Sequence, residues 1–305
     1  MNKETMQKAK DNKKDDFFTS YETIEEEMKY YTDFFENKII YCNTDDMDSN
    51  FWKYFDDNFE KFKLKKLVAT KYNQDGIGEK YELFIENGNK KYCKTKLIGN
   101  GSFDSEECLK TLQQSDIVIT NPPFSLFRDF IKILDEYDKK FIILGNLNSI
   151  TYKKIYEMAL QEKIRFGITG RGGKAKKFRV HKDYDLCATG ENNCWIDEYG
   201  NKFIRVSGIR WFTNLNHNVE PPFLNLTKKY NEKDYPKYDN KDAINVNKTK
   251  DIPCDYDGMI GVPITFLDKY NSKQFEIVDF RKGDDDKDLR INGKRLYFRI
   301  LIRKR

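Results

Sequence analysis

Histidines and closely spaced cysteine pairs are scarce in this sequence. It contains 2 histidines, His181 and His217, and 6 cysteines with no CxxC pair among them. Zinc sites and disulfide frameworks depend on such clusters, so we expect no metal site and reduced, mostly buried thiols. An enzyme with so few histidines needs a reaction that does not depend on an imidazole base.

Long apolar runs are absent as well. No stretch approaches the roughly 20 apolar residues that span a bilayer, and the opening "MNKETMQKAKDNKKDD" lacks the apolar core of a secretion signal. We therefore expect a cytoplasmic protein without a membrane partner. Aromatic residues make up 15% of the chain, so Phe and Tyr must supply much of the core.

Charged residues are abundant and unevenly distributed. They make up 34% of the chain with a net charge of +5, which alone is weak evidence for a polyanionic partner because both signs are mixed. Residues 163–182, "KIRFGITGRGGKAKKFRVHK", contain eight Lys and Arg and no acid. This basic segment is a candidate for binding phosphate groups.

Strand and helix patterns alternate along most of the chain. A helix capped by Ser20 is predicted by Ile24, Met28, Tyr31 and Phe35 at helical spacing. The following segments predict a strand, a helix with an apolar stripe from Phe51 to Phe62, and a second strand: "KIIYCN", "SNFWKYFDDNFEKF" and "LKKLVATKY". This order favours parallel βαβ pairing.

The later segments continue the series to residue 170. An NG turn inside residues 79–98 predicts an inserted β-hairpin. The next strands and helix are predicted at "DIVIT", "SLFRDFIKILDEY", "KKFIIL" and "IRFGITG". The expected fold is α/β, an open, mostly parallel, doubly wound sheet whose ligand site lies beyond the carboxyl ends of the strands.

The chain is expected to divide into three regions. Residues 1–16 are read as a flexible charged tail, residues 17–215 as one domain that contains the hairpin, and residues 216–305 as a second region. Residues 216–257 are polar, interrupted by Pro, and mostly irregular in pattern. The C-terminal "KRLYFRILIRK" alternates apolar and basic residues, which predicts an edge strand.

The segment "TNPPF" directly follows the buried strand "DIVIT". An exocyclic amine such as that of adenine is a poor nucleophile, and two hydrogen-bond acceptors placed at its two N–H bonds free its lone pair. Asn121 can supply a side-chain carbonyl and Pro122 a backbone carbonyl, while Pro123 holds Pro122 extended and Phe124 offers a flat face for a base. The alternative is a rigid turn that starts the next helix, but the position at a strand end favours chemistry.

Several segments resemble the EcoRI-type family of adenine-specific DNA methyltransferases. Besides NPPF, they are "DDFFTSYETIEEEM", "IIYCNTDD", "SNFWKYF", "LKKLVATKY", "GIRWFTNL", "YPKYDNKDAINV" and "DYDGMIGVPITFLDKYN". The resemblance implies a class I S-adenosylmethionine-dependent methyltransferase fold with a C-terminal target-recognition region in residues 216–305. It also implies methyl transfer to N6 of adenine in duplex DNA, as the modification enzyme of a restriction-modification system.

The resemblance also implies the site residues. Asn121, Pro122, Pro123 and Phe124 would form the catalytic loop. The cofactor S-adenosylmethionine would contact Phe17, Phe18, Thr19, Cys42, Asn43, Asp45, Asp46, Phe103, Asp104 and Asn121. A monomer is expected, with DNA as its partner and a restriction endonuclease paired to it in function without a stable complex.

Three of these assignments keep alternatives. The turn "YCNTDDMDSN" lacks the glycines that usually follow the first strand, and Asp45 and Asp46 are equally suited to a cofactor ammonium or hydroxyl. They also suit a solvated loop. "FFTS" is equally compatible with a helix cap, and so is Asp104 at the start of the next helix.

A target amine inside a stacked duplex is out of reach, so this chemistry needs the base to be extruded. We expect the basic segment to grip phosphates through Arg171, Lys174, Lys176, Lys177 and Arg179, the alternative being a solvated loop. Trp195 and Trp211 are expected in the core or in half-buried strands.

Rival functions remain at this point. NPP-type enzymes also methylate RNA adenines and the glutamine amide of proteins, although the glutamine enzymes commonly carry Tyr where this chain has Phe124. A noncatalytic nucleic-acid binding module with an unused cofactor site is the other alternative.

Overall fold

The computed structural model describes residues 17–305 except 75, 174, 187–192, 218 and 282–288. Two compact units form. Unit 1 consists of residues up to Asn146 together with 167–170 and 174–217, and unit 2 consists of 147–166, 171–173 and 218–305. The chain therefore enters unit 2 twice before residue 218, whereas the sequence predicts one continuous domain from 17 to 215.

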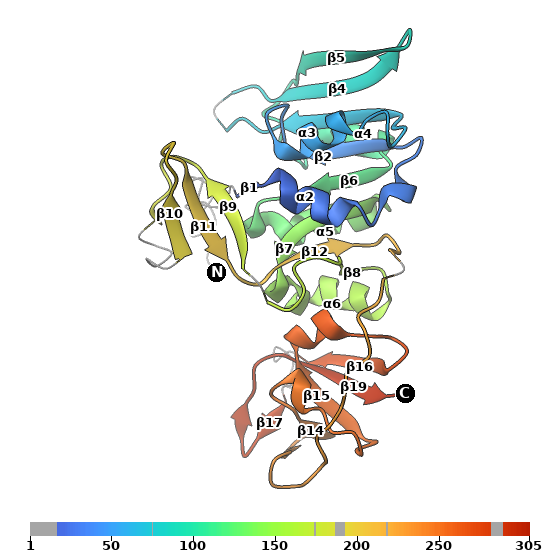
Figure 1. Ribbon diagram of the computed structural model, residues 1–305, viewed down its shortest axis with the longest axis vertical. Helices are drawn as coiled ribbons and strands as arrows, with labels where there is room; N and C mark the ends of the chain where they lie inside the picture. Colours follow the sequence, from blue (N-terminus) through green and yellow to red (C-terminus); the bar gives the residue numbers. More distant parts are fainter. Residues whose placement is uncertain (1–16, 75, 174, 187–192, 218, 282–288) are drawn as a thin grey trace. The chain divides into compact units, whose positions relative to one another are not determined.

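Unit 1 is built on a sheet with the strand order β5-β4-β3-β2-β6-β7-β12 (Figure 1). The pairs β2–β3, β2–β6 and β6–β7 are parallel, and β3–β4, β4–β5 and β7–β12 are antiparallel. The strands are β2 (Ile39–Asn43), β3 (Lys66–Lys71), β4 (Glu79–Glu86), β5 (Asn89–Lys96), β6 (Ile117–Thr120), β7 (Lys140–Asn146) and β12 (Ile209–Thr213). Continuous apolar runs such as "IVIT" of β6 suit parallel strands buried on both faces.

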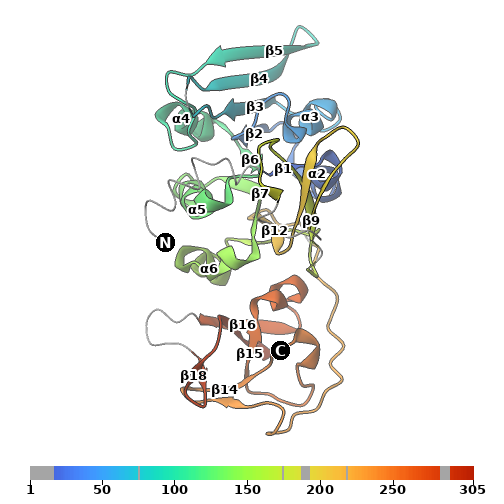
Figure 2. The same ribbon diagram turned by 90° about the vertical axis from the view of Figure 1, so that its left-hand side faces the viewer.

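Helices cover both faces of this sheet (Figure 2). They are α2 (Tyr21–Met28), α3 (Asn50–Asp57), α4 (Glu106–Gln114) and α5 (Phe127–Glu136). Helices α2 and α3 lie on one side and α4 and α5 on the other. Ile24 and Phe55 belong to the core cluster on the first side, and on the second side the rings of Phe127 and Phe212 lie 5.0 Å apart.

Two predicted helices end earlier than their apolar stripes. Helix α2 begins at the Ser20 cap, as predicted, but ends at Met28, and α3 ends at Asp57. Tyr31, Phe35, Phe59 and Phe62 follow in turns and short 3-10 segments, and their side chains are still buried. Spacing therefore identified the buried residues correctly, while the helix ends are set by other contacts.

A second, smaller sheet in unit 1 has the order β1-β9-β11-β10, with antiparallel pairs throughout. Its strands are β1 (Phe18–Thr19), β9 (Lys176–Val180), β10 (Cys194–Ile196) and β11 (Lys202–Val206). Phe178, Val180 and Ile204 on its inner side join the main core of unit 1. The N-terminal "FFTS" segment is thus a strand of this sheet before it becomes the cap of α2.

Unit 2 contains a sheet with the order β13-β14-β15-β19-β16. The helix and strands of unit 2, inside and outside this sheet, are α6 (Lys153–Leu160), β8 (Arg165–Phe166), β13 (Lys237–Tyr238), β14 (Lys241–Asn245), β15 (Met259–Pro263), β16 (Phe275–Arg281), β17 (Arg290–Ile291), β18 (Lys294–Arg295) and β19 (Arg299–Lys304). Short 3-10 helices complete both units: η1 (Thr32–Phe34), η2 (Phe124–Leu126), η3 (Leu147–Thr151), η6 (Thr249–Asp251) and η7 (Ile264–Lys269).

The prediction of a C-terminal edge strand is wrong. Strand β19 lies between β15 and β16, and Ile300, Leu301 and Ile302 are all fully buried. Three consecutive apolar residues need cover on both faces, which a central position provides and an edge does not. The sequence "IRFGITG" likewise gives only the two-residue strand β8.

Residues 147–166 belong to unit 2 because aromatic packing holds them there. The ring of Tyr156 on α6 lies 6.0 Å from Phe280 of β16 and 6.3 Å from Phe298. Within the described ranges, no helix is long and apolar enough to cross a membrane.

A buried carboxylate ties α2 to residues 167–170. Glu27 is fully buried, and its Oε1 accepts hydrogen bonds from the Tyr31 hydroxyl at 2.9 Å and the Ile168 amide at 2.8 Å. Its Oε2 accepts from the amide and hydroxyl of Thr169, both at 2.6 Å. A Cβ on Gly167 would lie 2.2 Å from Glu27 Oε1, so the close approach requires glycine.

We predict that Glu27→Gln lowers the free energy of unfolding by about 2 kcal/mol, because the new amide group must face a backbone N–H donor in a buried site. Urea denaturation measures the change, with the exposed neighbour Glu26→Gln as the matched control. Equal midpoints for the two variants would contradict the anchoring role.

Candidate active site

The NPPF loop lies at the carboxyl edge of the parallel strands. Strand β6 is buried along its whole length and ends at Thr120, and η2 begins at Phe124. Pro122 and Pro123 have no N–H to extend the β-ladder, so pairing stops and the chain turns toward α5. Because β2 and β6 are parallel neighbours, the residues after β2 lie at the same edge.

Asn121 presents an unpaired acceptor within this loop. Its Nδ2 donates to the Phe17 carbonyl at 2.6 Å, and its Oδ1 is buried without a hydrogen-bond partner in the described structure. A backbone carbonyl can only accept, so the amide nitrogen must face Phe17 and the free atom is the oxygen. Leaving such an oxygen unpaired costs about 1–3 kcal/mol, which favours a donor supplied by a ligand.

Aromatic rings form one wall beside Asn121. The half-buried ring of Phe124 lies 5.2 Å from that of Phe17, and Phe17 lies 5.6 Å from Phe178 of β9. Pro122 is buried and Pro123 is half-buried. The structure therefore brings Phe17 from the N-terminal segment into direct contact with both Asn121 and Phe124, as the sequence places them in one site.

The ends of β2 and β6 are joined through Thr120, a residue that the sequence reading missed. Its hydroxyl lies 2.6 Å from the Asn43 carbonyl and 2.7 Å from Asp45 Oδ2. The hydroxyl is the donor to both oxygens, so its one proton is shared between the Asn43 carbonyl and the Asp45 carboxyl. A threonine at a strand end gives no sequence signal for this role.

Asp45 titrates far above an ordinary aspartate. Burial raises the pKa of its carboxyl from 3.8 to about 7, while hydrogen bonds from Thr120 and Ser49 act in the opposite direction. Asp46 differs, because its Oδ2 forms a 2.9 Å ion pair with Lys71. The structure thus separates the two aspartates: Asp46 already has a cationic partner, and half-buried Asp45 has a raised pKa.

Cys42 and Asn43 lie at the end of β2 with different surroundings. Cys42 is fully buried in the core cluster, where burial raises the pKa of its thiol. The Asn43 side chain accepts a hydrogen bond from Thr70 at 3.2 Å, and its backbone carbonyl faces Thr120. The Cys42 side chain is therefore part of the core, and the Asn43 side chain is hydrogen-bonded within the sheet.

The "FFTS" segment supplies a second unpaired group. Thr19 is 5% exposed, and its hydroxyl has no hydrogen-bond partner in the described ranges. Its carbonyl accepts from Asn50 of α3 at 2.8 Å, which fixes the backbone. Phe18 points outward, with the Arg179 guanidinium 5.1 Å from its ring.

Phe103 and Asp104 lie before α4. Phe103 is buried with its ring 5.2 Å from Phe130, and exposed Asp104 accepts a hydrogen bond from the Ser102 hydroxyl. The cap of α4 is Ser105, so the alternative of Asp104 as the cap is wrong. No hydrogen bond or ring contact in the described part of the chain joins either residue to Asn121 or Asp45.

The basic segment is split between the units. Arg171 lies in unit 2, where its Nη2 donates to the Phe166 carbonyl at 3.2 Å, and Lys174 lies outside the described residues. Lys176 is half-buried, and burial lowers its pKa although Glu27 raises it. Lys177 and Arg179 are exposed on β9.

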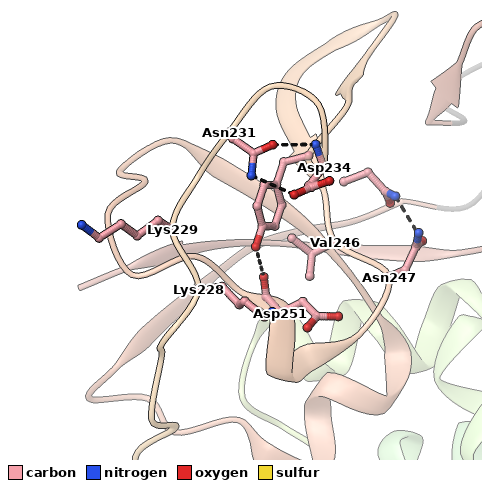
Figure 3. Close-up of a pocket in the computed structure, with 9 residues that line it drawn as sticks. Lys228, Lys229, Asn231, Asp234, Val246, Asn247 and Asp251 are labelled. Atoms are coloured by element: carbon pink, nitrogen blue, oxygen red, sulfur yellow. Dashed lines mark hydrogen bonds between the residues drawn. The ribbon is translucent and has the colours of Figure 1, made fainter.

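Unit 2 has a polar pocket of about 360 Å³ (Figure 3). Most of its polar side chains already pair: Asn231 donates to Asp234 at 2.9 Å, and the Tyr235 hydroxyl donates to the Asp251 carbonyl at 2.9 Å. It is lined by Lys228, Lys229, Asn231, Asp234, Tyr235, Asn245, Val246, Asn247 and Asp251. Within the residues searched, no cluster of His, Cys, Asp and Glu could hold a metal ion.

The raised pKa of Asp45 predicts a pH-dependent stability. Between pH 3.8 and about 7 the folded protein holds a proton that the unfolded chain has lost, so the free energy of unfolding falls as pH rises through this window. We expect Asp45→Asn to remove this slope and to gain stability relative to wild type from pH 5 to pH 8. Denaturant midpoints measure it, with Asp48→Asn as the control, and parallel wild-type and Asp45→Asn profiles would contradict it.

Comparison with known proteins identifies a family for this chain. The model of a family described as adenine-specific methyltransferase EcoRI matches residues 5–305. The chain is 49% identical over 316 residues to the type II methyltransferase M.EcoRI of Escherichia coli, covering 98% of this chain and 95% of that protein. No solved structure matches the chain.

Two mycoplasma proteins are also similar over nearly their whole length. The type II methyltransferase M.MgeORF184P of Mycoplasma genitalium is 42% identical, covering 97% of this chain and 98% of that protein. The type II methyltransferase M.MpnI of Mycoplasma pneumoniae is 39% identical, covering 98% of this chain and 97% of that protein.

Proposed function

The chain belongs to the EcoRI-type family of adenine-specific methyltransferases, and from this premise we propose how its own residues perform the reaction. It is a type II DNA methyltransferase that modifies adenine with S-adenosylmethionine as methyl donor, within a restriction-modification system. RNA adenine, protein glutamine and noncatalytic binding are thereby set aside as alternatives.

The fold is proposed to be the class I methyltransferase arrangement. Its support is the parallel series β3-β2-β6-β7 with helices on both faces. In such a sheet the ligand lies beyond the carboxyl ends of the strands, at the edge that holds Asp45 and Asn121.

The unpaired Asn121 Oδ1 is the observation that supports the catalytic assignment. We propose that it accepts one N6–H of the target adenine and that the Pro122 carbonyl accepts the other. Both bonds favour a tetrahedral nitrogen with its lone pair directed at the methyl group. The N6–C bond forms as the electrons of the S–C bond return to sulfur, and N6 then loses a proton to solvent.

The residues around Asn121 fit the cofactor by their donor and acceptor types. S-adenosylmethionine supplies an electrophilic methyl group on a sulfonium, and it also has a charged ammonium. Asp45 is a half-buried carboxyl with a raised pKa that a nearby cation would lower, and the Thr19 hydroxyl is an unpaired polar group in the same unit. We propose both as cofactor contacts. The other residues of the predicted cofactor site stay predictions: Phe17, Phe18, Cys42, Asn43, Asp46, Phe103 and Asp104.

The target adenine must leave the duplex to reach Asn121, at the usual cost of a few kcal/mol. We propose that Phe124 receives the extruded base against its ring and that Lys177 and Arg179 contact phosphates. Unit 2 is proposed as the target-recognition region, and Arg171 and Lys174 stay predictions as phosphate contacts. Action as a monomer in the cytoplasm, without a stable complex with the endonuclease, is also proposed.

Asn121→Ala should lower the rate of methyl transfer at least roughly 100-fold while leaving cofactor affinity nearly unchanged, because it removes one acceptor from the reacting amine. Transfer of labelled methyl to DNA and equilibrium binding of S-adenosylmethionine measure the two effects. Asn89→Ala, an exposed asparagine of β5, is the control. Near wild-type transfer by Asn121→Ala would disprove the acceptor role.

In the double variant Lys177→Gln and Arg179→Gln, the slope of log K against log salt for duplex DNA should fall in magnitude by about 2, because each lost phosphate contact removes about 0.9 from this slope. Fluorescence anisotropy at several salt concentrations measures this slope. Lys110→Gln with Lys132→Gln, which changes two exposed lysines on α4 and α5, should leave it unchanged. A slope equal to that of wild type would show that Lys177 and Arg179 are solvated residues of β9 without phosphate contacts.

A further inference from the structure

The outer side of the small sheet β1-β9-β11-β10 combines aromatic rings with positive charge. Strand pairing places Phe203 opposite both Arg179 and Trp195, and Arg205 opposite Lys177. Since side chains alternate along strands, these residues share one side, while Phe178, Val180 and Ile204 point into the core. We call Phe18, Lys177, Arg179, Trp195, Phe203 and Arg205 the aromatic-cationic face.

The rings and cations of this face contact one another. The rings of Trp195 and Phe203 are stacked, with centroids 5.4 Å apart and planes 8° from parallel. The Arg205 guanidinium lies 5.3 Å and the Lys177 ammonium 5.8 Å from the Trp195 ring. Trp195 is therefore a half-buried strand residue, as predicted, but one that lies under cations on an outer surface.

The charges of this face are not neutralised within the described structure. Lys177, Arg179 and Arg205 are exposed, and none of them forms a salt bridge with a described residue. Asp197 is the acid near Arg179, and its carboxylate is already held by hydrogen bonds from Asn201 and Tyr199. Three exposed cations without salt bridges, beside flat rings, complement a strand that offers phosphates and bases.

The face is joined directly to the catalytic loop. Phe17 contacts Asn121 and Phe124, and the next residue, Phe18, lies under Arg179 on the aromatic-cationic face. Phe17, in the wall of the proposed base site, and Phe18, at the start of this face, are consecutive residues. DNA held at Asn121 therefore passes close to β1 and β9.

We propose that the aromatic-cationic face binds unpaired bases beside the extruded adenine, with Trp195 and Phe203 as the stacking surface and Arg205 as a further phosphate contact. The proposal rests on the proposed function and adds residues to it. Aromatic rings interleaved with cations are how proteins hold single strands, because every base has a flat face whatever the sequence. Extrusion of the adenine leaves its neighbours without stacking on one side and its former partner without a base to pair with.

Tryptophan fluorescence provides a direct readout. Trp52 and Trp211 are 2% and 0% exposed, so Trp195 is the tryptophan that a bound base can reach. We expect a duplex with unpaired bases beside the target adenine to quench the emission more than the same duplex fully paired. Trp195→Phe should lose most of the quenching while keeping most of the affinity, since a ring remains.

Trp195→Ala and Phe203→Ala should each weaken binding of the partly unpaired duplex roughly tenfold, which is typical when one stacking ring is removed. Ile196→Ala is the matched control, because Ile196 is adjacent, 57% exposed and on the other side of β10. Circular dichroism confirms that the variants are folded. Arg205→Gln should reduce the salt slope by about 0.9.

The outcomes separate this proposal from the function on which it rests. Unchanged affinity for both alanine variants and no quenching, while wild type still methylates DNA, would overturn the stacking surface alone. Quenching equal for paired and unpaired duplex would overturn the role of unpaired bases. Failure of wild type to methylate any DNA would overturn both.

Discussion

The hydrogen bond from the Asn121 amide to the Phe17 carbonyl is the constraint on which the site depends. It joins residues 104 positions apart and fixes the amide nitrogen toward Phe17, while the buried amide oxygen keeps no hydrogen-bond partner in the described structure. The same contact brings the Phe17 ring against Phe124 and continues through β1 into the pairing with β9. One bond therefore orients the acceptor, one wall of the base site and the strand that presents Arg179.

Thr120 provides a second constraint, at the ends of β2 and β6. Its hydroxyl donates to the Asn43 carbonyl and to the Asp45 carboxyl, so one side chain holds the ends of β2 and β6 together. Burial raises the Asp45 pKa to about 7, and the hydrogen bond from Thr120 acts against this rise. The protonation of Asp45 therefore depends on Thr120 as well as on burial.

Local patterns were sufficient to predict much of the fold from sequence. Buried strands, the hairpin turn at Asn87 and Gly88, and the Ser20 cap depend on neighbouring residues and were found where expected. The position of β19 in the centre of its sheet depends on partners far along the chain, and so does the attachment of residues 147–166 to unit 2. The same limit applies to Glu27: nothing in "YETIEEEM" distinguishes the buried carboxylate from the exposed Glu26, because its partners at 168 and 169 are about 140 residues away.

The basic segment shows why a count of charges overstates binding. On β9, Lys177 and Arg179 face solvent, whereas Lys176 is half-buried near Glu27 and Phe178 is in the core. A strand exposes alternate residues, so a run of cations that folds as a strand offers only part of its charge to a partner. A cation that the strand turns toward the interior needs an acid nearby, and Glu27 raises the pKa of Lys176. The half-buried member of the run thus lies near an internal acid, and the exposed members, together with Arg205 of the neighbouring strand, are the cations that face solvent.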